Sequence, residues 1–160
     1  MNTIHTKTSI LPIFVLAIAL LATGCGSDTP NVSYEEVTLN DILEHVLELS
    51  EDEIDNSDNN RIPVGTVMVY RTSDNHLGKM VIAGNDEGND HGLTIHHTTY
   101  DSDESVILEA EGETIAGTFS YALDDSDDDF SLRNETDTER NFAPQNGAVF
   151  ATIGVDPSFE

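Results

Sequence analysis

Short runs of β-branched and aromatic residues, separated by turn residues, fill the chain from Pro63 onward. Runs of this composition and spacing are typical of antiparallel sheets, whose strands are joined by short hairpins. We predict strands at 66–72, 79–83, 93–100, 105–110, 113–123 and 147–155. The expected fold class is therefore mainly β, as a small antiparallel β-sandwich or barrel.

The alternation of apolar and polar residues is clearest in the predicted strand 113–123. Because successive side chains of a strand point to opposite faces, one face would carry Ile115, Phe119, Tyr121 and Leu123. This pattern predicts that Phe119 is a core residue.

One amphipathic helix is expected before the strands. Thr38 and Asp41 have the spacing of a capping box, in which each residue satisfies a backbone N–H of the other. Apolar residues then follow at helical spacing: Leu39, Ile42, Leu43, Val46 and Leu47. We predict an N-terminal helix over 39–49 whose apolar stripe packs on its own domain, followed by an acidic loop at 50–61.

Residues 10–22 form an uncharged apolar run of 13 residues, and Lys7 precedes it. A helix that spans a bilayer needs about 20 apolar residues, so this run is too short for a membrane span. A basic residue followed by a short apolar run is typical of a secretory signal peptide.

The segment Leu21-Ala22-Thr23-Gly24-Cys25 resembles the lipobox of bacterial lipoproteins, in which small residues precede a cysteine. The resemblance covers about the first 25 residues, and one departure is Ala22, where the family usually has leucine. It implies that 1–24 is a signal peptide and that the Cys25 sulfur receives a diacylglycerol. It also implies cleavage before Cys25 and acylation, for example with palmitate, of the new amine.

Two or more acyl chains anchor a protein stably, so the resemblance implies attachment to a membrane through lipid. In a Gram-negative cell, Gly26 after the cysteine, rather than aspartate, is similar to the pattern sorted to the outer membrane. In another cell type, the implied location is the outer face of the cytoplasmic membrane. Residues 25–37 are small and polar, and we expect them to form a flexible tether to a single domain at 38–160.

The charge of the chain excludes one class of partner. The formal net charge is −25, and the part after residue 24 has five basic against 31 acidic side chains. Nucleic acid binding requires clustered lysine and arginine to displace counterions from phosphates, so we expect no nucleic acid partner. The same charge repels anionic membrane surfaces, which leaves the lipid as the means of attachment.

An acidic segment at 124–145 is expected to form a long surface loop. Within it, Asp124, Ser126, Asp128 and Glu135 occupy positions 1, 3, 5 and 12 of an EF-hand-like spacing, which would bind Ca²⁺. Position 6, where the sharp turn needs glycine, is Asp129, and the flanking residues suggest strands rather than helices. These departures favour a solvated run of charge, with the Ca²⁺ site as the alternative.

Four histidines, His76, His91, His96 and His97, are the other concentration of metal-binding side chains. Neighbours on a strand point to opposite faces, so His97 would share the side of Leu93 and Ile95, while His96 faces the other way. These two histidines cannot readily ligate one ion together. A site made by His91, His96 and a carboxylate such as Asp90 stays open.

Catalytic motifs are missing from the sequence: there is no Gly-x-Ser-x-Gly, no His-Glu-x-x-His, no Gly-rich phosphate loop and no Ser-x-x-Lys. We therefore expect a non-enzymatic envelope lipoprotein that acts as a binding or structural module on another envelope component. One alternative is a Ca²⁺-dependent binding module. The other is a hydrolase with an unrecognised site, which a cleft that gathers histidine or carboxylate side chains would favour.

Overall fold

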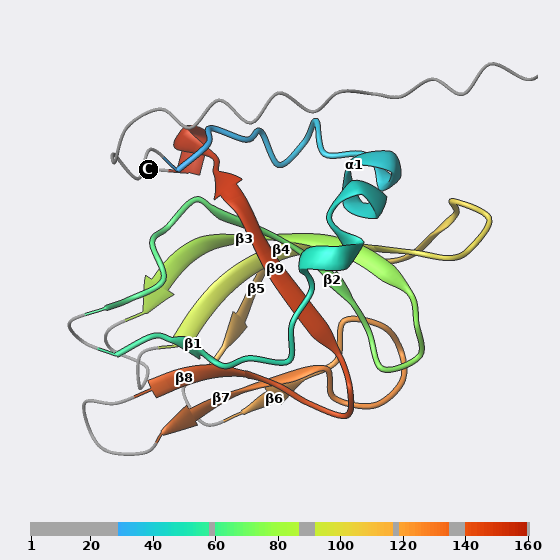
Figure 1. Ribbon diagram of the computed structural model, residues 1–160. Coiled ribbons are helices and arrows are strands. Elements are labelled where there is room, and N and C mark those ends of the chain that lie inside the picture. The colour runs from blue at the N-terminus through green and yellow to red at the C-terminus, as the bar shows by residue number, and fades with distance from the viewer. Residues whose placement is uncertain (1–28, 58–59, 87–91, 117–118, 135–139, 160) are drawn as a thin grey trace, which may run out of the picture.

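The protein is a sandwich of two antiparallel β-sheets, seen in a computed structural model that describes residues 29–57, 60–86, 92–116, 119–134 and 140–159 (Figure 1). One sheet has five strands in the order β5-β4-β3-β2-β9 and the other has four in the order β1-β8-β7-β6. The mainly-β prediction is confirmed, and of its two forms the sandwich is found.

The five-stranded sheet consists of β2 (Thr66–Arg71), β3 (Leu77–Asp86), β4 (Gly92–Tyr100), β5 (Val106–Ile115) and β9 (Val149–Val155). The four-stranded sheet consists of β1 (Ile54–Asp55), β6 (Ser120–Tyr121), β7 (Phe130–Asn134) and β8 (Arg140–Pro144). Helix α1 (Leu39–Glu44) and the 3₁₀ turn η1 (Val46–Glu48) precede the strands, and the 3₁₀ turn η2 (Pro157–Phe159) follows them. No helix within these described segments is long and apolar enough to cross a membrane.

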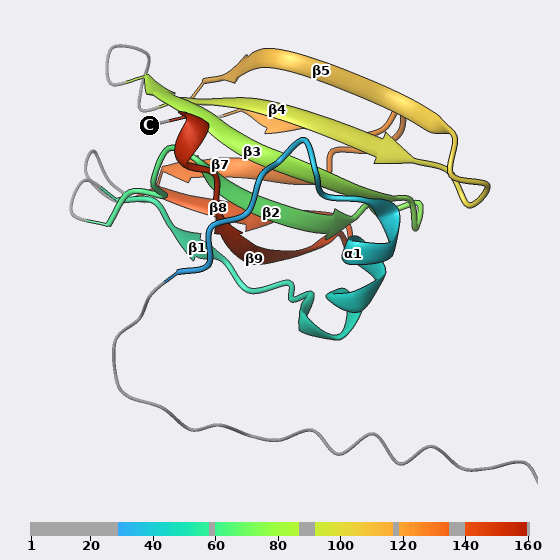
Figure 2. The same cartoon turned by 90° about the horizontal axis from the view of Figure 1, so that it is seen from above.

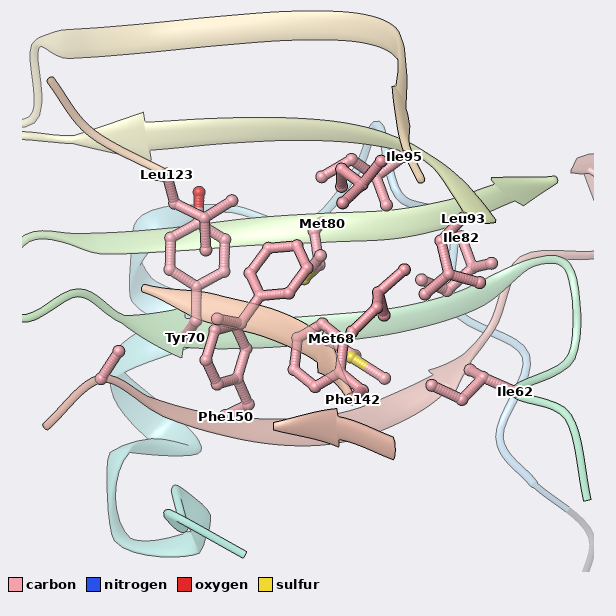
Figure 3. Packing of buried hydrophobic residues seen from close by; sticks show 14 residues of the cluster. Ile62, Met68, Tyr70, Met80, Ile82, Leu93, Ile95, Leu123, Phe142 and Phe150 are labelled. Carbon is pink, nitrogen blue, oxygen red and sulfur yellow. The ribbon is translucent and has the colours of Figure 1, made fainter. Parts of the chain in front are cut away.

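The main core lies between the two sheets (Figure 3). Its centre is a group of aromatic rings, in which Phe130 stacks on Phe142 at 4.4 Å and Phe150 meets Phe142 edge-on at 4.9 Å. Met68 and Tyr70 of β2 point into this core and are completely buried. Such packing of rings adds to the free energy gained from burying their apolar area.

A second apolar cluster covers the outer face of the five-stranded sheet. Residues 30–49 run across β2 and β3 (Figure 2), where Tyr34, Val37 and Ile42 lie over Val67 and Val69. Strand β2 is therefore buried on both faces, which explains why its residues form a continuous apolar run instead of alternating.

The predicted tether at 25–37 is wrong from Pro30 onward, because these residues belong to the domain. The Val32 N–H donates to the Val155 carbonyl at 2.9 Å, and the Val155 N–H donates to the Pro30 carbonyl at 2.9 Å. The Tyr34 N–H donates to the Asp156 carboxylate at 2.7 Å. Composition alone hid this role, because the segment is fixed mainly by backbone bonds and by a few well-spaced apolar side chains.

The Lys79 side chain of β3 also holds residues 34–37 in place. Its Nζ donates to the carbonyl oxygens of Tyr34 at 2.8 Å and Val37 at 3.0 Å, and it lies 4.6 Å from the centre of the Tyr34 ring. Burial lowers the pKa of Lys79, while the nearby Glu35 and Glu109 carboxylates act in the opposite direction. The Lys79 ammonium group is therefore buried and binds backbone carbonyl groups of its own domain.

Helix α1 begins as predicted but ends early. The capping box is present, with the Thr38 N–H donating to the Asp41 carboxylate at 2.7 Å and the Asp41 N–H donating to the Thr38 hydroxyl at 3.4 Å. The helix ends at Glu44, and the predicted stripe divides: Ile42 is completely buried, whereas Leu43 and Leu47 are 51% and 97% exposed. The expectation that the whole stripe packs on the domain is therefore wrong for two of its residues.

The predicted loop at 124–145 is also wrong, because it contains strands β7 and β8. Phe130, Leu132 and Phe142 point inward and are buried, so an alternating apolar pattern lies hidden among the acidic residues. In the described part of this segment, the acidic stretch 124–129 forms a loop before β7.

The predicted strand 113–123 is broken, and Phe119 is not a core residue. Strand β5 runs continuously through 106–115 and ends at the buried Ile115, after which the chain crosses to the four-stranded sheet and forms β6. The crossing resets the alternation of faces, so Leu123 is buried but Phe119 is 63% exposed.

Candidate functional site: a groove at the distal end of the sandwich

The sandwich has two ends that differ in what they carry. At the proximal end, defined here by residues 29–31, Val155 and η2, the N-terminal segment joins the domain through the Asn31–Val155 bridge. At the distal end lie α1, the turn at 72–76 between β2 and β3, and the turn at 101–105 between β4 and β5 (Figure 1). Strand β9 spans the two ends, and its length separates them by about 20 Å at roughly 3.3 Å per residue.

A groove of about 450 Å³, the distal groove, opens between α1 and these two turns. Its volume lies in the range of clefts that bind ligands in proteins. Its apolar wall comes from three elements and consists of Leu39, Leu43, Leu77 and Tyr100. Polar side chains of the two turns complete its lining, namely Asp74, Asn75, His76, Asp101 and Ser102.

The turn at 72–76 is held in place by hydrogen bonds. The Thr72 N–H donates to the His76 carbonyl at 2.9 Å, and the Thr72 hydroxyl accepts from the His76 N–H at 3.1 Å. Asn75 has a φ of 70°, a left-handed conformation that asparagine tolerates better than most residues. The Asn75 N–H closes the turn by donating to the Thr72 carbonyl at 3.0 Å.

Two buried carboxylates tie this turn to the loop at 124–129. Asp129 is completely buried and accepts from the N–H groups of Ser73 at 2.9 Å and Leu123 at 2.8 Å. Burial raises the pKa of Asp129, and those backbone donors oppose the shift. Asp124 is 3% exposed and lies 3.0 Å from the Nδ1 atom of His76.

Burial alone would raise the pKa of Asp124, but hydrogen bonds outweigh it and lower the pKa below its usual value. The donors are the hydroxyls of Ser126 and Thr72 and the His76 ring, together with the Ser126 N–H. Asp124 is therefore an ionised acceptor at neutral pH, and it fixes the orientation of the His76 ring at the edge of the groove.

Of the residues of the predicted Ca²⁺ site, Asp124 and Ser126 lie together, with the Ser126 N–H and hydroxyl donating to the Asp124 carboxylate. Asp124 is buried and its oxygens serve Ser126 and His76, while Asp128 is exposed. The fourth residue, Glu135, lies outside the described residues. Strand β7 extends from Phe130 to Asn134, about 13 Å at roughly 3.3 Å per residue, so the chain does not wrap around 124–128 as an EF-hand loop would. Among the described residues no three His, Cys, Asp or Glu side chains could hold a metal ion together.

The predicted orientations of the paired histidines are confirmed. His97 is completely buried between the sheets with Leu93 and Ile95, and its Nε2 lies 3.1 Å from the Tyr121 hydroxyl. Burial lowers the pKa of His97 to about 4. His96 points to the outer face and meets the Phe159 ring edge-on at 5.3 Å. The other members of the open metal site, Asp90 and His91, lie outside the described residues, as does Cys25.

The distal groove does gather a histidine and carboxylates, the feature expected of a hydrolase. His76 with Asp124 behind it resembles the part of a catalytic site in which a carboxylate orients a base. A nucleophile must also lie within hydrogen-bond reach of the base. In the described part of the chain, the His76 ring is hydrogen-bonded to Asp124 and makes no hydrogen bond to a hydroxyl. The described geometry thus shows a histidine oriented by a carboxylate at the edge of the groove.

The distal groove could not be found from local sequence patterns, because its lining comes from α1, β3, β4 and two turns that are far apart in the chain. Two signals were present. The helical stripe contains more apolar residues than so short a helix can bury, and His76 stands in a turn between strands.

Comparisons of the chain with protein-family models, curated proteins and solved structures found no match. Function is therefore inferred from the geometry of the two ends.

Proposed function

We propose that this protein is a lipid-anchored envelope protein that acts as a non-enzymatic binding module. Its proximal end is held at the bilayer, and its distal groove faces away from the bilayer toward another envelope component. The observation that carries this proposal is that the first described residues, 29–31, and the distal groove lie at opposite ends of the sandwich. The cell type decides the membrane, which is the outer membrane in a Gram-negative cell and otherwise the outer face of the cytoplasmic membrane.

The reach of the tether supports this orientation. Cys25 precedes Thr29 by four residues, and an extended chain spans at most about 3.6 Å per residue. The first described residue can therefore lie at most about 14 Å from the lipidated cysteine. Residues 30–49 add nothing to this reach, because they are fastened to the outer face of the sheet.

The charge of the domain acts in the same direction. With five basic against 31 acidic side chains, the domain is repelled by anionic headgroups, and the lipid is the one attractive contact that the proposal needs. The short tether keeps the proximal end close to the bilayer, while repulsion favours a domain that stands away from it. The distal groove is then presented to soluble or membrane-bound partners.

The anchor itself is tested by replacing Cys25. The Cys25→Ser variant should no longer incorporate labelled palmitate in cells, and it should leave the membrane fraction. A variant that is still labelled and still fractionates with membranes would contradict the lipoprotein assignment.

The orientation is tested with two matched single-cysteine reporters, Ser158→Cys at the proximal end and Ser102→Cys at the distal end. Both serines are exposed, and each donates to the aspartate at one or two residues before it. The Cys25 sulfur is blocked by lipid in the mature protein, so a fluorescent maleimide labels the new thiol alone.

In vesicles that carry a quencher on the lipid headgroups, the label at position 158 should be quenched much more than the label at position 102. Equal quenching, or stronger quenching at position 102, would contradict the proposed orientation.

A further inference from the structure

We propose that the distal groove binds a segment of another envelope protein in which apolar residues alternate with lysine or arginine. This inference rests on the proposed function for the location of the partner. The binding itself depends on the groove alone.

The apolar wall of the groove is the first observation. Leu43 is 51% exposed in the groove, and Leu47, four residues later, is 97% exposed. Large apolar side chains that remain this exposed gain free energy when a partner covers them. Because Leu39, Leu43 and Leu77 line one wall of the groove, the occupant that fits it presents apolar side chains to that wall.

The charge around the groove selects the polar part of the occupant. Asp74 and Asp101 line the rim and are exposed, and the exposed Asp103 and Glu104 follow in the same turn. Neither lysine nor arginine is among the residues that line the groove, and Lys79 is occupied with the backbone of residues 34–37. This potential attracts a cationic segment and repels an acidic one, including a second copy of this chain.

The ring of Tyr100 gives the cation a further partner. It is half-buried in the apolar wall, and Asp101, the next residue in the chain, lines the same groove. An ammonium or guanidinium group over an aromatic face is attracted by the electron density of the ring. One side chain of the segment can thus contact a ring and a carboxylate while its neighbour packs on Leu43.

Both lips of the groove are already ordered, so binding has little chain entropy to lose. The turn at 101–105 is closed by the Asp101 N–H to the Ser105 carbonyl at 2.8 Å and by the Glu104 N–H to the Asp101 carbonyl at 3.0 Å. The opposite lip is fixed by the contact between His76 and Asp124. A preformed site of this kind gives more of its contact energy to affinity.

The test measures binding of a fluorescent hexapeptide of alternating leucine and lysine to the mature lipidated protein in phosphatidylcholine nanodiscs. The uncharged lipid limits direct binding of the peptide to the bilayer, and empty nanodiscs give the background. Saturable binding that weakens with added salt is expected. A leucine–glutamate hexapeptide and a serine–lysine hexapeptide should bind at least about tenfold more weakly.

Two pairs of variants locate the binding. Asp74→Asn with Asp101→Asn should weaken binding about three- to tenfold, because two exposed ion pairs are lost. Glu111→Gln with Glu113→Gln on β5 removes the same charge from exposed positions outside the groove and should change binding less than about twofold. Leu43→Ser should weaken binding about tenfold. Phe119→Ser, at an apolar residue that is 63% exposed but outside the groove, should leave binding unchanged.

Three results would overturn the proposal: no saturable binding of the leucine–lysine peptide, equal loss in the two acidic double variants, or unchanged affinity in Leu43→Ser. Equal melting temperatures of the variants exclude unfolding as the cause of a loss. The quenching experiment reads the orientation of the domain without the peptide, so loss of peptide binding together with the expected quenching pattern contradicts this proposal alone.

Discussion

The two faces of the five-stranded sheet are covered in different ways. On the inner face, a second sheet contributes regular strands and stacked phenylalanine rings. On the outer face, an irregular segment at 30–49 contributes a few apolar side chains, hydrogen bonds to β9 and the carbonyl groups that Lys79 binds. Together the two covers leave Val67, Met68, Val69 and Tyr70 of β2 completely buried, so a polar segment without periodicity can be as much a part of the domain as a strand.

The largest effect of a single substitution is expected on the inner face. Phe142 is completely buried and touches the rings of Phe130 and Phe150. Phe142→Ala should lower the free energy of unfolding by about 3–5 kcal/mol, because it removes apolar contacts and leaves a cavity. Urea denaturation measures the change, and a loss below about 1 kcal/mol would mean that the sheets do not meet at this ring.

A pH dependence should come from the same face. His97 has a pKa of about 4 in the folded protein, against an ordinary value of 6.5 for an exposed histidine, so between these values the unfolded chain binds a proton that the folded protein does not. The contribution of His97 to the free energy of unfolding is therefore complete above about pH 6.5. It decreases as the pH falls toward 4, by about 3 kcal/mol in total.

The raised pKa of Asp129 acts with the opposite sign, so the comparison with a His97→Gln variant isolates the histidine. Urea midpoints at pH 7 and pH 4.5 should differ much less in the variant than in the wild type. Equal pH dependence of the two proteins would show that His97 is accessible to protons in the fold.

The outer face should show a smaller effect from one polar contact. The Tyr34 hydroxyl lies 3.1 Å from the Thr98 hydroxyl, and the tyrosine is 5% exposed. Tyr34→Phe keeps the ring and removes this hydrogen bond, so the free energy of unfolding should fall by about 1 kcal/mol. No change in the urea midpoint would indicate that the outer cover is looser than the inner one.

The smallest effect is expected at Phe119, which lies on neither face. Because it is 63% exposed, Phe119→Ala should change the free energy of unfolding by less than about 0.5 kcal/mol. Thermal denaturation can measure this, and a loss of about 3 kcal/mol would instead place Phe119 in the core, as strand alternation predicts.

Sequence patterns were sufficient for features that depend on local spacing. The capping box at Thr38 and the opposite orientations of His96 and His97 follow from the periods of helices and strands. The alternation of faces gave a wrong prediction for Phe119, because the chain leaves β5 and changes sheets before this residue. The two-residue period of a strand cannot be extended across such a break. Prediction from alternation also failed in 130–144, where a high density of carboxylates concealed the alternation of β7 and β8.

Features that depend on distant contacts were not predictable from local spacing. The carboxylate of Asp124 resembled a metal ligand in the sequence, yet in the fold it fixes His76, 48 residues away. The groove wall likewise combines Leu43 of α1 with Tyr100 of β4, which are far apart in the sequence. The Lys79 contacts to residues 34–37 were not predictable for the same reason, because neither Lys79 nor this segment carries a local sequence pattern that indicates the contact.

Residues 30–37 matter most for both the fold and the anchor, because their place in the domain fixes the outer cover and the short reach of the tether. Urea denaturation of fragment 26–160 against fragment 38–160 tests this directly. Removing Tyr34 and Val37 uncovers the outer face, so fragment 38–160 should lose about 3–6 kcal/mol or fail to fold. Equal urea midpoints for the two fragments would contradict this role and make these residues a flexible tether.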